Sequence, residues 1–453
     1  MSTLDRGRLQ QLIARERATY LANNPRSAAA FEAARSTLFG GVPMTWMVKW
    51  SGGFPLYLDG AHGNRIRDID GHTFVDFALG DTGAMAGHSP EATTKAINDR
   101  VTVGGGLTTM LPSEDAAWVG AELERRFGLP LWSFALTATD ANRWALRLAR
   151  LATGKPKVLA FSYCYHGSVD ETVVVMGADG STQARPGSVG PQVDPAETTR
   201  VAEFNDLASV ERALAHGDVA VVITEPALTN IGIVLPEPGF LEGLRDLCTT
   251  YGALLLIDET HTFSAGPGGM TKAHSLQPDI FVIGKSIAGG IPIGTYGITQ
   301  EVADRINAHP DADLVDVGGV GGTLAGNALS MAAARATLGE VLTEDAFGKM
   351  TELATRFTDG VQQALDGADV PWTIQQLGAR AEYRFARPAP RNGTESAHAG
   401  DDDLDEYMHL YTLNRGILMT PFHNMALMCP TTTVADVDLH TEVFAGAINE
   451  LFG

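Results

Sequence analysis

The chain is poor in cysteine and in basic residues. Three cysteines occur among its 453 residues, far apart in the sequence at Cys164, Cys248 and Cys429. An odd number of scattered cysteines provides neither a disulfide framework nor a CxxC zinc motif. We therefore expect a protein without disulfide bonds and without a bound metal.

The charge balance and the lack of long hydrophobic runs exclude further classes of protein. Lysine and arginine total 33 against 54 aspartate and glutamate residues, which gives a formal net charge of −21 at pH 7. Nonspecific nucleic-acid binding needs clustered basic side chains, so this balance disfavours it. No segment approaches the roughly 18 apolar residues of a membrane span, and the N-terminus lacks the apolar core of a signal peptide. We expect a cytoplasmic protein with no nucleic-acid or membrane partner.

The pattern of apolar residues predicts a large α/β protein. From about residue 113 to 338, short apolar runs alternate with amphipathic segments, which is typical of a mostly parallel sheet flanked by helices. We predict an N-terminal helical arm and small meander over residues 1–75, a large domain over 76–338 and a C-terminal small domain over 339–453. The five apolar runs are 131–137, 157–162, 219–225, 253–258 and 279–285.

Two further segments give local predictions. In the helix after residue 137, Trp144, Leu148 and Leu151 share one face, and Gly154 is placed to end the helix. We expect that face to be buried and the arginines beside it to be solvated. The acidic run 401–406 lacks the spacing of a calcium loop, and we expect it to be a solvated excursion.

Polar residues end three of the predicted strands. Glu225, Asp258 and Lys285 each follow an apolar run, and ligands of open α/β sheets bind outside the carboxyl ends of the strands. Ala138 and Thr139 follow another run at the start of a helix, where free backbone N–H groups and the helix dipole favour a phosphate. A lysine amine, a buried acid and an anion cradle are what pyridoxal phosphate (PLP) requires.

At this point the sequence resembles the class III aminotransferases of fold type I. Within them it is similar to the branch that holds glutamate-1-semialdehyde aminomutase and β-amino-acid transaminases. The resemblance covers about residues 38–450 and implies a large PLP-binding domain with a mostly parallel sheet, plus a smaller α+β domain formed by the N- and C-terminal parts. The matching motifs, in the order of the family, are Thr137-Ala138-Thr139-Asp140-Ala141, Tyr165-His166-Gly167, Glu225-Pro226, Asp258-Glu259-Thr260, Gly284-Lys285 with Gly289-Gly290, and Gly322-Thr323 with Gly326-Asn327.

The resemblance implies a role for each matching residue. Lys285 would form the Schiff base with PLP and later move a proton. Asp258 would keep the pyridine nitrogen as its cation, and Tyr165 would stack on one face of the ring. The other implied cofactor contacts are Thr260 on the opposite face, Ala138 and Thr139 at the phosphate, and Glu225 and His166 close by.

Other positions concern the dimer and departures from the family. Thr323 would reach the phosphate in a partner subunit, which implies a homodimer with shared active sites. Ala138 replaces a glycine of the family, and Thr260 replaces an aliphatic residue. His261 stands where the family often has methionine, and it could tune the site or have a structural role.

The expected substrate pocket lacks the arginines that related enzymes use to bind carboxylates. Met44 and Trp46 occupy one such segment, and Phe422 occupies the other. These side chains predict an apolar pocket for amines or hydrophobic amino acids, although ordinary packing would explain them equally well. Arg380 and Arg384, on a predicted strand, would restore a carboxylate clamp.

Three functions remain open from the sequence. We favour a PLP-dependent aminotransferase that moves an amino group from an amine or hydrophobic amino acid to a keto acid or aldehyde by a ping-pong mechanism. The alternative is an aminomutase of the glutamate-1-semialdehyde type, against which the missing arginine near Met44 argues. A cofactor-retaining carrier without turnover is the third, and the presence of both Lys285 and Asp258 disfavours it.

Overall fold

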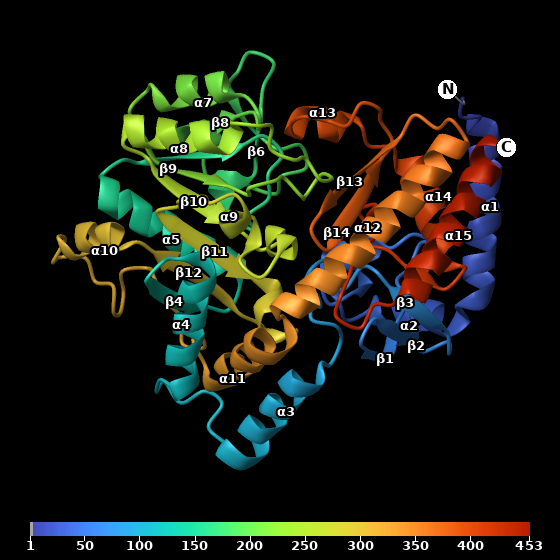
Figure 1. Ribbon diagram of the computed structural model, residues 1–453, viewed down its shortest axis with the longest axis horizontal. Coiled ribbons are helices and arrows are strands. Elements are labelled where there is room, and N and C mark those ends of the chain that lie inside the picture. The colour runs from blue at the N-terminus through green and yellow to red at the C-terminus, as the bar shows by residue number, and fades with distance from the viewer. Residues whose placement is uncertain (1–2) are drawn as a thin grey trace. The chain divides into compact units, whose positions relative to one another are not determined.

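The computed structural model describes residues 3–453, which divide into two compact units (Figure 1). The first unit contains the residues through Pro90 together with 345–389 and 399–453. The second contains Glu91–Glu344 and the short stretch Pro390–His398. The first unit therefore joins both ends of the chain, whereas the second is nearly continuous in sequence.

The second unit is built around a seven-stranded sheet with the order β4-β12-β11-β10-β9-β5-β8. Strand β12 runs antiparallel to both of its neighbours, and all other neighbouring pairs are parallel. The prediction of a mostly parallel sheet is confirmed, because each of the five apolar runs forms one of its strands. The strands are β4 (Leu131–Ala135), β5 (Lys157–Phe161), β8 (Thr199–Ala202), β9 (Val219–Thr224), β10 (Leu254–Asp258), β11 (Ile280–Gly284) and β12 (Gly294–Ile298).

The central strands of this sheet are buried along their whole length. Every residue of β9, β10 and β11 is buried, so their sequences are continuous apolar runs and not alternating ones. A two-stranded ribbon of β6 (Val174–Met176) and β7 (Thr182–Ala184) lies outside the sheet. The α-helices of the unit are α3 (Glu91–Asp99), α4 (Glu114–Phe127), α5 (Ala138–Thr153), α6 (Pro195–Thr198), α7 (Leu207–Leu214), α8 (Phe240–Tyr251), α9 (Gly269–Ala273), α10 (Gln300–Asn307), α11 (Ala328–Ala336) and, in the later stretch, α13 (Gly393–His398).

Helix α5 packs closely against the sheet, with contacts to β9, β11 and β12. Thr137 caps its first turn, and Gly154 ends it in the left-handed conformation, as predicted. The predicted apolar face is only partly correct, because Leu148 is buried but Trp144 and Leu151 are half-buried. Small side chains occupy much of the buried face because they allow the helix to lie close to the strands. The small buried residues are Ala141, Asn142, Ala145 and Ala149.

The first unit contains two smaller sheets. One has the order β1-β2-β3-β15, so a strand from the C-terminal part extends the N-terminal meander, and the other has the order β13-β14-β16. The strands are β1 (Leu58–His62), β2 (Arg65–Asp68), β3 (Thr73–Asp76), β13 (Thr373–Leu377), β14 (Arg380–Arg384), β15 (Ile417–Leu418) and β16 (Met425–Leu427). The α-helices are α1 (Arg6–Asn23), α2 (Pro25–Ala34), α12 (Glu344–Gly367), α14 (Asp402–Leu413) and α15 (Val434–Phe452).

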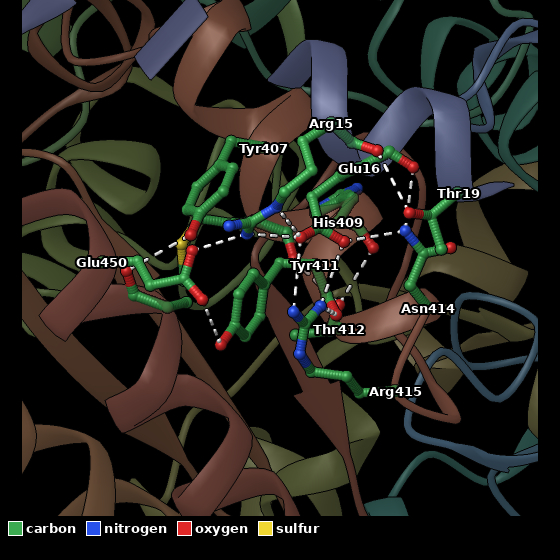
Figure 2. A network of polar contacts seen from close by, with 12 residues as sticks. Arg15, Glu16, Thr19, Tyr407, His409, Tyr411, Thr412, Asn414, Arg415 and Glu450 are labelled. Atoms are coloured by element: carbon green, nitrogen blue, oxygen red, sulfur yellow. Dashed lines mark hydrogen bonds and ion pairs between the residues drawn. The ribbon is translucent and has the colours of Figure 1, made fainter. Parts of the chain in front are cut away.

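A polar network ties α1 to the C-terminal part of the first unit (Figure 2). Glu16 of α1 is buried and accepts hydrogen bonds from Arg415 Nη1 at 3.0 Å and from Asn414 Nδ2 at 2.8 Å. Arg15 Nη2 donates to Glu16 Oε1 at 2.6 Å and also contacts Glu450 of α15. Burial opposes the charge on Glu16, but the three donors outweigh it and lower the pKa of this carboxyl. The N-terminal helix is therefore anchored by an ionised side chain.

The acidic run 401–406 is not a solvated excursion, and that prediction is wrong. Asp401 caps α14 by accepting a hydrogen bond from the backbone N–H of Leu404 at 3.1 Å. Three acidic side chains follow in the first turn, where the positive end of the helix dipole favours them. The run therefore begins a helix whose later residues are almost all buried.

Among residues 3–453, no helix combines the length and the apolar character that crossing a bilayer requires.

Candidate active site

Three ionisable residues lie at one edge of the large sheet. Asp258 is the last residue of β10, Glu225 follows β9 and Lys285 follows β11. These three strands are parallel neighbours, so their carboxyl ends lie side by side (Figure 1). The structure thus brings together the three strand-end residues that the sequence singled out.

Lys285 has an unusual backbone conformation. Its φ is +49°, in the left-handed region that costs a residue with a side chain about 1–2 kcal/mol. Its Nζ lies 2.8 Å from Nε2 of His261, which comes from the segment after β10. Strained backbone of this kind is concentrated at functional sites.

Two paired glycines allow the start of α5 to lie next to Lys285. Gly284 of β11 is opposite Gly294 of β12 in the register of these strands. A Cβ at Gly294 would lie 2.2 Å from the carbonyl oxygen of Thr137, and a Cβ at Gly284 would lie 3.1 Å from the Cβ of Ala138. The missing side chains therefore let the lysine segment approach the first turn of α5.

Asp258 is a buried carboxylate surrounded by donors. His166 Nδ1 lies 2.9 Å and Asn142 Nδ2 2.8 Å from its Oδ2, and the backbone N–H of Thr260 donates to Oδ1 at 3.0 Å. Burial raises the pKa of Asp258, but the hydrogen bond from His166 leads the effects that outweigh it and lower the pKa to about 2. Burial also opposes the charge on His166, whereas Cys164 and Asp258 raise its pKa to about 10. The pair is therefore an ionised carboxylate and a protonated imidazole at neutral pH.

Glu225 differs from Asp258 in its protonation. It is also buried, and it accepts hydrogen bonds from Thr229 Oγ1 at 2.5 Å and from the Thr229 backbone N–H at 3.2 Å. Burial raises the pKa of Glu225 to about 7. The two carboxyls at this sheet edge thus differ in pKa, since Asp258 is ionised at neutral pH whereas Glu225 titrates close to it, as is common where a site both stabilises a cation and exchanges protons.

The start of α5 and the segment around Tyr165 lie against each other. Thr139 Oγ1 accepts a hydrogen bond from the backbone N–H of Ser168 at 3.2 Å, and a Cβ at Gly167 would lie 2.0 Å from that oxygen. Tyr165 is 44% exposed, so its ring remains available to a ligand. The N–H of Asp140 is capped by Thr137 Oγ1, whereas the first-turn N–H groups of Ala138 and Thr139 precede it and could face an anion.

These residues fit PLP. A lysine amine, a buried ionised carboxylate and a helix N-terminus match the aldehyde, the pyridine nitrogen and the phosphate of the cofactor. One buried hydroxyl, Ser286 Oγ, next to Lys285 in sequence, also has no hydrogen-bond partner within residues 3–453. A polar ligand would satisfy such groups, because leaving them unpaired is costly.

The residues predicted for the dimer contact and the substrate pocket are divided between the two units. Thr323 is exposed in the second unit, in a turn where the N–H of Ala325 donates to the carbonyl of Gly322. In the first unit, Trp46 and Phe422 pack edge to face, with ring centroids 5.8 Å apart, and Met44 is also exposed. The structure thus brings Trp46 and Phe422 together at the surface of their unit.

Arg380 and Arg384 lie on β14, as predicted, and the alternation of a strand places them on the same face with Glu382. Arg380 is fully buried and donates a hydrogen bond to Thr82 Oγ1. Glu382 is also buried, and His423 Nδ1 lies 3.4 Å from its Oε1. Arg380 is therefore embedded in a polar layer of the first unit, whereas Arg384 is half-buried.

Sequence reasoning missed Asn142. Its side chain donates both to Asp258 and to the carbonyl of His166, at 3.1 Å for the latter. A signal was present, because an asparagine among small apolar residues in a helix must find a partner once it is buried.

The family model described as "Aminotransferase class-III" matches residues 47–448 of the chain. Among characterised proteins, the chain is 34% identical over 366 residues to glutamate-1-semialdehyde 2,1-aminomutase of Anaeromyxobacter dehalogenans, covering 80% of this chain and 83% of that protein.

Solved structures give the same grouping. A crystal structure named as a glutamate-1-semialdehyde-aminomutase from Pseudomonas aeruginosa PAO1 is 49% identical, with a TM-score of 0.96 and 99% of each chain covered. A variant of that protein was solved in complex with PMP. A β-phenylalanine aminotransferase from Variovorax paradoxus is 26% identical, with a TM-score of 0.85 and 97% of each chain covered.

Proposed function

The chain belongs to the class-III aminotransferases, and from that premise we propose that it is an aminomutase, which moves an amino group between carbons of one substrate. The protein is an enzyme of PLP fold type I with PLP as its cofactor. The observation that carries the proposal is the 49% identity, over 99% of both chains, to a protein named as an aminomutase. This correspondence favours the aminomutase over the intermolecular aminotransferase that the sequence alone favoured.

We assign the cofactor contacts to the residues of the second unit. Bound PLP supplies an electron sink for the carbon that carries the amino group. Lys285 would hold the cofactor through its amine and, once free, would move a proton. Asp258 would favour a proton on the pyridine nitrogen, because its carboxylate is ionised and buried. His166 and Asn142 hold that carboxylate in place.

The other contacts follow from the first turn of α5 and its neighbours. The N–H groups at Ala138 and Thr139 would hold the phosphate, and Tyr165 and Thr260 would hold the ring. Glu225, whose pKa burial raises to about 7, would be able to take up or release a proton close to the cofactor. We also propose a cytoplasmic homodimer in which Thr323 reaches the phosphate of the neighbouring subunit.

The substrate we propose is an amino carbonyl compound with an apolar side. Met44 and Trp46 fall where the family resemblance implies an arginine for a substrate carboxylate, and the cation of that segment is Lys49, whose Nζ lies 5.6 Å from the centroid of the Phe422 ring. An aminomutase reaction has no keto acid as a second substrate, so it does not need a site for that acid's carboxylate, and the exposed apolar side chains of Met44, Trp46 and Phe422 are suited to apolar groups.

A second candidate is transamination of an amine without a carboxylate. The exposed edge-to-face pair of Trp46 and Phe422 favours it, because exposed aromatic surface commonly binds apolar ligands.

One assay separates these candidates. The loaded enzyme is incubated with an amino aldehyde, or with its vicinal diamine, with no keto acid present, and the product is followed by NMR. Rearranged product without an acceptor supports the aminomutase, whereas turnover only after adding a keto acid supports the transaminase. The Lys285→Ala variant is the matched control, and no turnover of any amine by the wild-type enzyme would overturn both proposals.

A further inference from the structure

His261 makes a direct polar contact with the lysine that holds the cofactor. Its Nε2 lies 2.8 Å from Lys285 Nζ. The residue stands three positions after Asp258 and belongs to the turn that follows β10. None of the cofactor contacts assigned above involves this imidazole, so the proposed function gives it no role.

The segment that carries His261 is held rigidly. The backbone N–H of Glu259 donates to the carbonyl of Val282 in β11 at 2.8 Å, which ties the turn to the strand that leads to Lys285. The Glu259 carboxylate accepts hydrogen bonds from Thr262 Oγ1 at 2.6 Å and from the N–H of Thr271 at 2.5 Å. Gly269 is required there, because a Cβ would lie 2.5 Å from Glu259 Oε2. The imidazole therefore has a fixed place beside the lysine.

The nearby carboxyls are held by other donors. Asp258 is paired with His166, Glu225 is bonded to Thr229, and Glu259 is bonded within its own turn. Cys164 also acts on His166, whose pKa it raises. Among the contacts of the lysine amine, the one with His261 provides a base at hydrogen-bond distance.

We propose that His261 is the proton acceptor that keeps the amine of Lys285 in its reactive, neutral form. The lysine ammonium must lose a proton before its nitrogen pair can attack a carbon or remove a proton from one. One N–H bond of Lys285 breaks, one forms at Nε2 of His261, and the positive charge moves from the ammonium to the imidazolium. The reverse transfer restores the resting pair, so no other reactant is needed. This inference rests on the proposed PLP-dependent function.

The test compares two variants with a matched control. His261→Gln keeps a polar side chain that can hold Lys285 by a hydrogen bond but cannot take up its proton, and His261→Met removes both abilities. His274→Gln changes an exposed histidine of the same unit and serves as the control. Circular dichroism checks folding, and borohydride reduction with peptide mass analysis checks that PLP is attached to Lys285.

Two measurements follow on the loaded proteins. The visible spectrum of the resting enzyme is titrated between about pH 5 and 10, and the single-turnover rate with one amine is measured over the same range. We expect His261→Gln and His261→Met to lose about 10²-fold in the single-turnover rate at neutral pH. Both should also lose one titration step that the wild type and His274→Gln share.

Each outcome has a distinct meaning. A wild-type rate and pH profile in His261→Gln would overturn the inference, because a hydrogen-bonded structural role would then suffice. A wild-type rate in His261→Met would overturn it as well. If PLP is not trapped on Lys285 in the wild-type protein, the proposed function fails first, and the borohydride step identifies that failure separately.

Discussion

His166 and Asp258 share a buried hydrogen bond of 2.9 Å in which the imidazole is protonated and the carboxylate is ionised. Both side chains are buried, with 0% of the imidazole and 5% of the carboxylate exposed, so each depends on the other for its charge. The pair thus presents a fixed negative charge at the sheet edge without a net charge in the protein interior.

Replacement of His166 tests this dependence. We expect His166→Gln to weaken PLP binding by about 10- to 100-fold, because a charge-assisted hydrogen bond contributes about 1.5–3 kcal/mol and its loss raises the pKa of Asp258. The measurement is an absorbance titration of the apoprotein with PLP at several pH values, in which the loss should grow on acidification. His216→Gln, at an exposed position of the same unit, should bind as the wild type does. Equal affinity in His166→Gln would contradict the assignment.

The raised pKa of Glu225 predicts that the stability of the folded protein depends on pH. This pKa is raised from an ordinary value of 4.5 to about 7, so the unfolded chain releases this proton at lower pH than the folded protein does. Folding stability is therefore lost as pH rises from about 4.5 to about 7, by up to about 3 kcal/mol from this group.

The Glu225→Gln variant should lack that loss. Its stability relative to the wild type, measured by urea unfolding of the apoprotein, should improve between about pH 5 and pH 8. A constant difference across this range would show that Glu225 does not titrate there. The absolute difference is less informative, because glutamine also loses one acceptor for Thr229.

Substitution of Gly294 tests the close approach of β12 to the start of α5. A Cβ there would lie 2.2 Å from a backbone oxygen, which a side-chain rotation cannot relieve. We expect Gly294→Ala to cost about 1–3 kcal/mol of unfolding free energy and to weaken PLP binding, because the first turn of α5 must shift. Gly120→Ala, in a helix where a Cβ meets nothing within 4 Å, should be neutral or stabilising. Unchanged PLP affinity in Gly294→Ala would argue against a phosphate site at Ala138 and Thr139.

Much of this fold follows from local sequence patterns. The apolar runs that became β9, β10 and β11 are continuous because both faces are buried, and their polar last residues mark the site. The hydrogen-bond partner of a side chain does not follow from such local patterns. That Asn142 donates to Asp258, or that His261 reaches Lys285, depends on how segments far apart in sequence pack together. The acidic run 401–406 was misread for a similar reason, because charge alone does not distinguish a loop from a capped helix start.

The network around Glu16 predicts that the N-terminal helix stabilises the first unit. Glu16→Ala removes a buried carboxylate whose partners Arg15 and Arg415 keep partial access to water, so we expect a loss of about 1–3 kcal/mol at neutral pH (Figure 2). The pKa of Glu16 is lowered in the folded protein, so its stabilisation is present above about pH 4.5 and is lost as the pH falls through the folded value. The difference between variant and wild type in urea unfolding should therefore shrink on acidification. Glu32→Ala removes an exposed pair with Arg35 on α2 and should change stability by less than about 0.5 kcal/mol at either pH. A Glu16→Ala loss that is the same at low and neutral pH would mean that packing, and not the ionised carboxylate, holds α1 in place.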